Sequence, residues 1–166
     1  MALKFVLSLQ SSELNWIAGF QGDGEFRRIM IWLSYLGSEA FAYVLPFTYF
    51  VVSRRAGARL YLLFSLSSSL VGTLKMAFCL PRPYWVDPRI RALSGSSSYG
   101  MPSGHALGAS VVWPLVARTI GTPWAWAPGL LIVLLVSASR VYLGAHFISD
   151  VVGAWIVAAG LVFGFD

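Results

Sequence analysis

Five long stretches of the chain are apolar in their middles and carry charged residues only near their ends. They cover about residues 35–53, 58–80, 104–119, 124–141 and 147–165. A hydrocarbon core about 30 Å thick is crossed by roughly 20 mostly apolar helical residues. The pattern therefore predicts an all-α fold, a multi-pass transmembrane helix bundle of about five spans.

The N-terminal segment, residues 1–28, differs because polar residues interrupt its apolar positions too often for a membrane span. These residues are Lys4, Gln10, Glu13, Asn15, Asp23, Glu25, Arg27 and Arg28. An amphipathic helix over about 3–19 that lies in the membrane interface fits this pattern better. We predict one membrane-embedded domain over 1–166, with this interfacial segment at 1–28 and a transmembrane core at 35–165.

The composition agrees with a membrane protein. Apolar and aromatic residues make up 57% of the 166 residues and charged residues 11%, whereas a soluble domain usually carries about 25% charged residues. Cys79 is the only cysteine, so no intrachain disulfide can form. The net charge of +5 suits nucleic acid, anionic lipid headgroups or a phosphate-bearing substrate. Because the cations belong to membrane helices rather than to an exposed basic stripe, we do not expect a nucleic-acid partner.

A chain that crosses the membrane five times brings its connections alternately to two faces. One face receives the turns at Arg54, Arg55, Arg59 and Arg118. The other face receives Lys75, Arg82, the 81–103 loop, His105, Arg140, His146 and Asp150. Both histidines, one carboxylate and three cations are therefore expected to converge on one side.

Each of these groups also has an ordinary structural explanation. Lys75 can extend its ammonium to the interface and Arg82 can anchor a span end. Arg140 and Asp150 can form an ion pair between helices, and His105 can be a polar residue at a helix start. Taken singly these explanations are favoured. Taken together they require several unrelated coincidences on one face, because ionisable groups in membrane helices are costly unless they are paired or functional.

The spacing of the second histidine favours chemistry. His146 and Asp150 are four positions apart, so on a continuous helix they share one face. The carboxylate can accept a proton from one imidazole nitrogen, which fixes the tautomer and leaves the other nitrogen with a free lone pair. Such an imidazole is a nucleophile or a base.

A candidate anion site precedes the third apolar stretch. Ser103 and Gly104 stand where that helix should begin, and backbone N–H groups at a helix N-terminus attract anions. Glycine allows close approach of the anion, and serine adds a hydroxyl donor. With Lys75, Arg82 and Arg140 nearby, the positive charge exceeds what a carboxylate needs, so a phosphoryl group is the expected ligand.

These residues form three motifs in order. They are Lys75 with Arg82-Pro83, Pro102-Ser103-Gly104-His105, and Ser139-Arg140 with His146 and Asp150. Over residues 75–150 the chain resembles the type 2 phosphatidic acid phosphatase family of membrane lipid phosphatases. That family shares its active-site architecture with vanadium-dependent haloperoxidases.

The resemblance implies a role for each motif residue. His146 is expected to be the nucleophile that forms a phosphohistidine, with Asp150 as its orienting partner. His105 is expected to be the general acid for the leaving alkoxide and then the base that activates water. The residues expected to hold the phosphate oxygens are Lys75, Arg82, Ser103, Gly104 and Arg140. No metal and no cofactor are implied.

The expected function is hydrolysis of a phosphomonoester or pyrophosphate of a lipid, such as phosphatidate, phosphatidylglycerol phosphate or an isoprenoid pyrophosphate. The expected partners are this lipid phosphate and the bilayer. A phosphotransferase using the same phosphohistidine is the alternative, and a transporter-type protein is a weaker one. The family resemblance favours a plasma (inner) membrane location with the site facing outward, and the sequence leaves the oligomeric state open. Arg89 and Arg91 are either solvated loop charges or groups that attract anionic headgroups.

Overall fold

The computed structural model describes residues 2–164, and every regular element in that range is a helix. The elements are α1 (Ala2–Phe20), α2 (Glu25–Tyr35), α3 (Glu39–Val52), α4 (Arg54–Phe78), α5 (Pro83–Val86), α6 (Gly104–Ile120), the short 3-10 helix η1 (Pro123–Ala125), α7 (Trp126–Tyr142) and α8 (Ile148–Gly164). The prediction of an all-α fold is confirmed.

Helix α6 is the centre of the bundle and packs against α3, α4, α7 and α8. Its residues 106–112 are all buried, so no face of this stretch meets the surroundings. Several of them are Ala, Gly or Ser, and small side chains let neighbouring helices approach closely. The apolar core of Leu60, Leu107, Val111 and Val151 forms along this axis.

Local signals in the sequence explain where the helices begin and end. The Ser38 hydroxyl accepts a hydrogen bond from the Phe41 N–H at the start of α3, and the Ser53 hydroxyl caps α4 in the same way. Helix α6 ends at Gly121, whose φ of 76° is in the left-handed region that glycine tolerates. Because Ser38 is the cap, the first predicted span begins as a helix at Glu39 rather than at residue 35.

Within residues 2–164, two stretches are long and apolar enough to cross a membrane. They are Arg54–Val86, which continues α4 into α5, and Pro123–Tyr142. Helices α2 and α3 together form a third candidate, with a bend of 43° between them. Helix α8 is apolar but shorter. The helices fall where the five spans are predicted, whereas the number of crossings stays a prediction.

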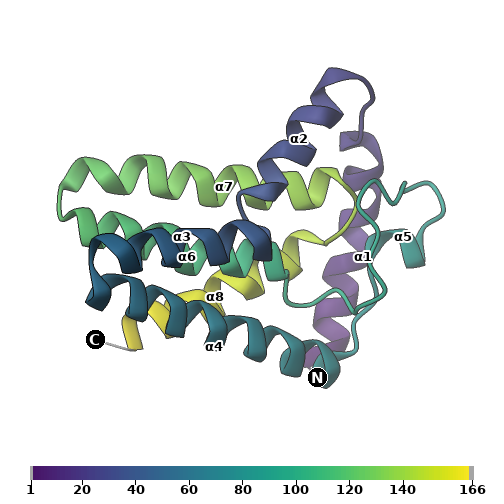
Figure 1. Cartoon of the computed structure of the whole chain (residues 1–166). Helices are drawn as coiled ribbons and strands as arrows, with labels where there is room; N and C mark the ends of the chain where they lie inside the picture. Colours follow the sequence, from purple (N-terminus) through teal and green to yellow (C-terminus); the bar gives the residue numbers. More distant parts are fainter. Residues whose placement is uncertain (1, 165–166) are drawn as a thin grey trace.

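Residues 2–28 contain one complete helix and the beginning of a second. Helix α1 ends at Phe20, and Glu25 begins α2, which packs on α7. Figure 1 shows α1 running across one end of the bundle, at the end where α7 turns into α8 and where the α4–α6 connection lies. The turns between α3 and α4 and between α6 and α7 lie at the opposite end. The predicted N-terminal helix is therefore present, and its interfacial position stays a prediction.

Two loop arginines attach this N-terminal segment to the connection between α5 and α6. Arg89 pairs with Asp87 at 2.6 Å and also donates to the Asn15 side chain. Its hydrogen bonds hold the pKa of the Asp87 carboxyl below the usual value. Arg91 pairs with Asp23 at 2.7 Å. Both arginines therefore form ion pairs while their side chains stay 62% and 47% exposed, respectively.

Candidate active site

A tight turn between α7 and α8 positions His146. The carbonyl oxygen of Arg140 accepts hydrogen bonds from the Ala145 and His146 N–H groups, at 3.1 and 3.3 Å, which closes the turn. Gly144 has a φ of 68°. The turn directs the His146 side chain into the bundle, and only 2% of the residue is exposed.

The hydrogen bonds of His146 determine its tautomer. Nδ1 lies 3.2 Å from Oδ2 of Asp150, and a carboxylate only accepts hydrogen bonds, so Nδ1 carries the proton. Nε2 lies 3.4 Å from Nη1 of Arg82, and a guanidinium only donates, so Nε2 carries the lone pair. Both contacts indicate the same tautomer, in which Nδ1 carries the proton and the Nε2 lone pair is directed toward Arg82.

The imidazole is also held neutral. Burial, chiefly, and the positive charges of Arg140, Arg82 and Lys75 lower the pKa of His146 well below its usual value. A neutral imidazole keeps the lone pair that a nucleophile or a base requires.

Lys75 and Arg82 are anchored by the loop that precedes α6. The Lys75 ammonium donates to the Ser98 hydroxyl and to the Tyr99 carbonyl oxygen. The Arg82 guanidinium donates to the Ser98 carbonyl oxygen at 2.6 Å, to the Ser98 hydroxyl at 3.0 Å and to the Ala145 carbonyl oxygen at 2.8 Å. Lys75, near the end of α4, and Arg82, just before α5, are thus held beside the histidine turn.

Arg140 reaches the same place from the last turn of α7. Its Nη1 donates to the Ser34 hydroxyl of α2 at 2.6 Å and to the Ser94 hydroxyl at 3.3 Å. Its Nε is buried and has no hydrogen-bond partner among the described residues, and the same holds for the hydroxyl of Ser103. A buried donor without a partner is costly, so these two groups are suited to a ligand with acceptor oxygens.

Ser103, Gly104 and His105 stand at the beginning of α6. The Ser103 N–H donates to the Asp150 carbonyl oxygen at 3.1 Å, which ties this helix start to α8. Gly104 and His105 line a cavity of about 110 Å³ between α3, α4 and α6. The polar members of its lining include Glu39 and Ser67.

The eight residues singled out from the sequence lie at one end of the bundle. His146 interacts electrostatically with Arg140, Arg82, Lys75 and His105. Asp150 contacts His146 directly, and Ser103 contacts the Asp150 backbone. Gly104 lies beside His105 at the helix start. Among the described residues there is no group of three or more His, Cys, Asp or Glu that could hold a metal ion.

Four residues that support this site carry no recognisable signal in the sequence. Ser98 holds Lys75 and Arg82, and Ser34 holds Arg140. The other two are Gln10, which donates to Asp150, and Glu13, which accepts from the start of α8. Serine is frequent along this chain, and the polar residues of 1–28 indicate only that the segment does not span the membrane.

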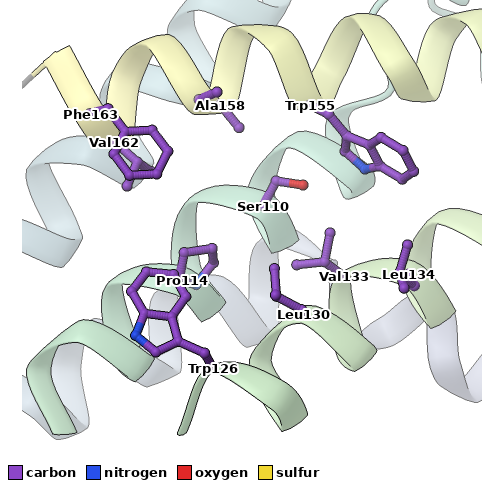
Figure 2. Close-up of a pocket in the computed structure, with 11 residues that line it drawn as sticks. Ser110, Pro114, Trp126, Leu130, Val133, Leu134, Trp155, Ala158, Val162 and Phe163 are labelled. Carbon is purple, nitrogen blue, oxygen red and sulfur yellow. The ribbon is translucent and has the colours of Figure 1, made fainter. Parts of the chain in front are cut away.

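A larger cavity lies away from the site. It has a volume of about 340 Å³ and is lined by residues of α6, α7 and α8. Figure 2 shows its side chains, which are apolar or aromatic except for Ser110. The lining has no titratable group, so this cavity does not contribute to acid–base or nucleophilic chemistry.

The turn predicts a large effect for a small substitution, Gly144→Ala. A Cβ there would lie 2.6 Å from the Arg91 carbonyl oxygen and 2.7 Å from the Gln21 amide nitrogen, at a φ of +68°. We expect the free energy of unfolding to fall by about 1–3 kcal/mol. Thermal unfolding in detergent measures this loss. Gly160→Ala, where a Cβ has nothing within 4 Å, is the control, and equal melting temperatures for the two variants would contradict the prediction.

Comparison with known proteins identifies the family. A family model described as the PAP2 superfamily matches residues 56–165. The undecaprenyl-diphosphatase of Sulfolobus acidocaldarius is 32% identical over 142 residues, which cover 81% of this chain and 66% of that protein. Phosphatidylglycerophosphatase B of Bacillus subtilis is 33% identical over 97 residues, 49% of this chain and 48% of that protein. The chain thus matches less than two thirds of the length of either relative.

Solved structures agree with the family. The crystal structure of a transmembrane PAP2-type phosphatidylglycerolphosphate phosphatase from Bacillus subtilis is similar with a TM-score of 0.79 and 25% identity, covering 99% of this chain and 94% of that one. Aquifex aeolicus LpxE has the same fold, with a TM-score of 0.82 and 22% identity over 92% of this chain and 91% of that one. Together with the family model and the apolar helices, this similarity means that the chain is a membrane protein of the PAP2 superfamily.

Proposed function

We propose that this protein is a lipid phosphatase that hydrolyses a phosphomonoester or pyrophosphate of a lipid through a phosphohistidine on His146. The observation that carries the proposal is the orientation of that imidazole. Asp150 contacts Nδ1, so that Nε2 carries the lone pair, which points toward Arg82. A phosphoryl group is the electrophile that the neighbouring cations suit best.

In the first half of the reaction, Nε2 of His146 attacks phosphorus. The N–P bond forms as the bond from phosphorus to the lipid oxygen breaks. His105, which becomes protonated when the negatively charged phosphoryl group binds beside it, gives its proton to that leaving oxygen. Lys75, Arg82 and Arg140 stabilise the charge on the three phosphoryl oxygens. Asp150 stabilises the positive charge that develops on the His146 ring as the new bond forms.

In the second half, water replaces the lipid. His105, now neutral, takes a proton from a water molecule as the water oxygen attacks phosphorus. The N–P bond breaks, its electrons return to Nε2 of His146, and inorganic phosphate leaves. The enzyme is then restored with the same protons that it had at the start.

The organic part of the substrate extends from His105 into the 110 Å³ cavity between α3, α4 and α6. The cavity supports this position because it adjoins the residue that must reach the leaving oxygen. A lipid substrate is supported by the apolar helices around the site and by two relatives, an undecaprenyl-diphosphatase and a phosphatidylglycerophosphatase. Sphingosine-1-phosphate phosphatase 2 of mouse, 30% identical over 139 residues, is a further relative with a lipid phosphate in its name.

For the orientation, we propose that the site faces outward from the plasma membrane. Arg54, Arg55 and Arg59 gather at the start of α4, at the end of the bundle opposite the site. Compact arginine turns of this kind favour the cytoplasmic side. We also propose that the whole chain forms one phosphatase domain, with residues 1–28 in the membrane interface.

The test is a phosphate-release screen of the purified protein across lipid phosphates and lipid pyrophosphates, with and without EDTA. We expect release from at least one lipid substrate, unchanged by the chelator, because the cations take the place of a metal. Full loss of activity with EDTA would contradict the proposed chemistry. A parallel screen with alcohols and sugars as acceptors distinguishes hydrolysis from phosphotransfer, since a transferase would form a phosphorylated acceptor in place of free phosphate.

A further inference from the structure

Helix α1 contacts the catalytic pair although it precedes it by more than a hundred residues. Gln10 is buried, with 3% of the residue exposed. Its side chain donates a hydrogen bond from Nε2 to Oδ1 of Asp150 at 3.3 Å. The residues are 140 positions apart. The amide nitrogen must face the carboxylate, because two oxygens in this position would repel each other.

This hydrogen bond completes the surroundings of a carboxylate that has no exposed surface. Oδ2 of Asp150 accepts from Nδ1 of His146 at 3.2 Å and from the Phe147 N–H at 3.0 Å. Oδ1 has Gln10 as its side-chain donor. Three donors on two oxygens fix the rotation of the carboxylate, and this rotation sets the direction of the imidazole.

A second residue of α1 holds the helix that carries Asp150. The Glu13 carboxylate accepts from the Ile148 N–H at 2.6 Å and from the Ser149 N–H at 3.3 Å. These are the first N–H groups of α8, which have no partner within their own helix. A negative charge there is also favoured by the helix dipole. Gln10 and Glu13 are three positions apart on α1, so one face of the helix makes both contacts.

Both residues lie outside the segment 56–165 that the family model matches. We propose that Gln10 and Glu13 are positioning residues of this active site. Gln10 orients the Asp150 carboxylate, and Glu13 fixes the start of α8, so that His146 presents Nε2 to the substrate. This inference rests on the proposed phosphatase function for its kinetic consequences, whereas its structural consequence can be measured on the resting protein.

The kinetic test compares Gln10→Ala and Gln10→Glu with Asn15→Ala. Asn15 is on the same helix and binds Arg89 without touching the catalytic pair, so its loss controls for the docking of α1. We expect Gln10→Ala to lower kcat about tenfold with KM within about twofold, because a hydrogen bond to a charged group is lost. Asn15→Ala should keep kcat within about twofold of the unmodified protein.

The charge variant separates orientation from packing. Gln10→Glu has nearly the same shape but places a second carboxylate beside Asp150. Asp150 already contacts His146 and interacts electrostatically with Glu13, Lys75 and Arg82. At about pH 8 we expect Gln10→Glu to lose more kcat than Gln10→Ala, because the two carboxylates repel each other. This loss should become smaller toward about pH 5.5, where a proton shared between the two carboxyl groups restores the hydrogen bond to Asp150. A packing role predicts instead that Gln10→Glu is more active than Gln10→Ala at every pH.

Glu13 is tested by removal and by partial rescue. Glu13→Ala should lower kcat several-fold, since it removes both the cap and the negative charge at the start of α8. Melting temperatures measured alongside show whether the fold is kept. Glu13→Gln keeps an oxygen that accepts one N–H and should recover part of the loss. Equal losses in the two Glu13 variants, or equal kcat in Gln10→Ala and Asn15→Ala, would overturn the proposal.

The structural readout requires no substrate. The chain contains two histidines, so selective ¹⁵N labelling of histidine in protein with a histidine-free tag gives the imidazole signals of His105 and His146 alone. We expect Gln10→Ala to shift the Nδ1–H signal of His146 and Asn15→Ala to leave it unchanged. Unchanged signals in Gln10→Ala would overturn the inference even in an active enzyme. A shift in a protein without phosphatase activity would support it while the proposed function fails.

Discussion

His146→Ala should abolish lipid phosphate hydrolysis, with a loss of at least about 10⁴-fold in kcat. The imidazole is the one group in the described site with a directed lone pair beside Arg82, and alanine has nothing to form the covalent bond to phosphorus. The measurement is phosphate release together with acid-labile, base-stable ³²P on the protein after rapid quenching. The unmodified protein should carry this label and His146→Ala should not.

His105→Ala is the matched control for this prediction. It removes the other histidine and leaves the nucleophile, so the label on the protein should still form from a substrate with a good leaving group, such as an aryl phosphate. General acid–base catalysis typically contributes about 10²- to 10⁴-fold to the rate. The rate with a substrate whose leaving group needs no proton should therefore fall less in His105→Ala. Label on His146→Ala, or its complete absence on His105→Ala with the aryl phosphate, would refute the assignment of the two histidines. Vanadate, which mimics five-coordinate phosphorus, should bind the unmodified protein and not His146→Ala.

Asp150→Ala should cost about 10³- to 10⁴-fold in kcat, because it removes both the acceptor that orients His146 and the charge that stabilises the forming bond. Its removal also leaves Arg82 and Lys75 with less compensating charge in a buried site, so the melting temperature should fall. The paired variant Asp150→Asn separates the two contributions. The Phe147 N–H and Nδ1 of His146 both donate to Oδ2, so the amide oxygen of an asparagine takes that position.

The remaining NH₂ group of that asparagine then faces Gln10, whose Oε1 has no partner among the described residues and can accept after the amide rotates. Asp150→Asn should therefore keep the tautomer of His146 and lose only the charge, at about 10²- to 10³-fold in kcat. The ¹⁵N signals of His146 check the tautomer and steady-state kinetics check the rate. Asp87→Asn, a carboxylate bound to Arg89 in the loop, is the control and should keep kcat. A change to the Nε2–H tautomer in Asp150→Asn would refute the role given to Gln10.

The sequence alone predicts the helices with small errors. The apolar stretches predicted the positions of α3, α4, α6, α7 and α8, since apolar runs and their caps act locally. The N-terminal helix was also predicted, but α2 was not, because residues 25–35 mix charged and apolar positions without a span-like run. If successive helix connections alternate between the two ends of the bundle, Lys75, Arg82, His105 and Arg140 fall at the same end.

Only the tertiary structure decided which groups support the site. Ser34 and Arg140 are 106 positions apart, and Glu13 and Ile148 are 135 apart. No periodicity or motif marks such partners, because a single hydrogen bond across the fold depends on how α1 and α2 are docked against α7 and α8. The sequence by itself determined the helices and the reactive residue types, since these follow from local hydropathy and from spacing within short motifs. The direction of the His146 lone pair follows instead from Asp150, Arg82 and Gln10, which meet only when distant segments pack together.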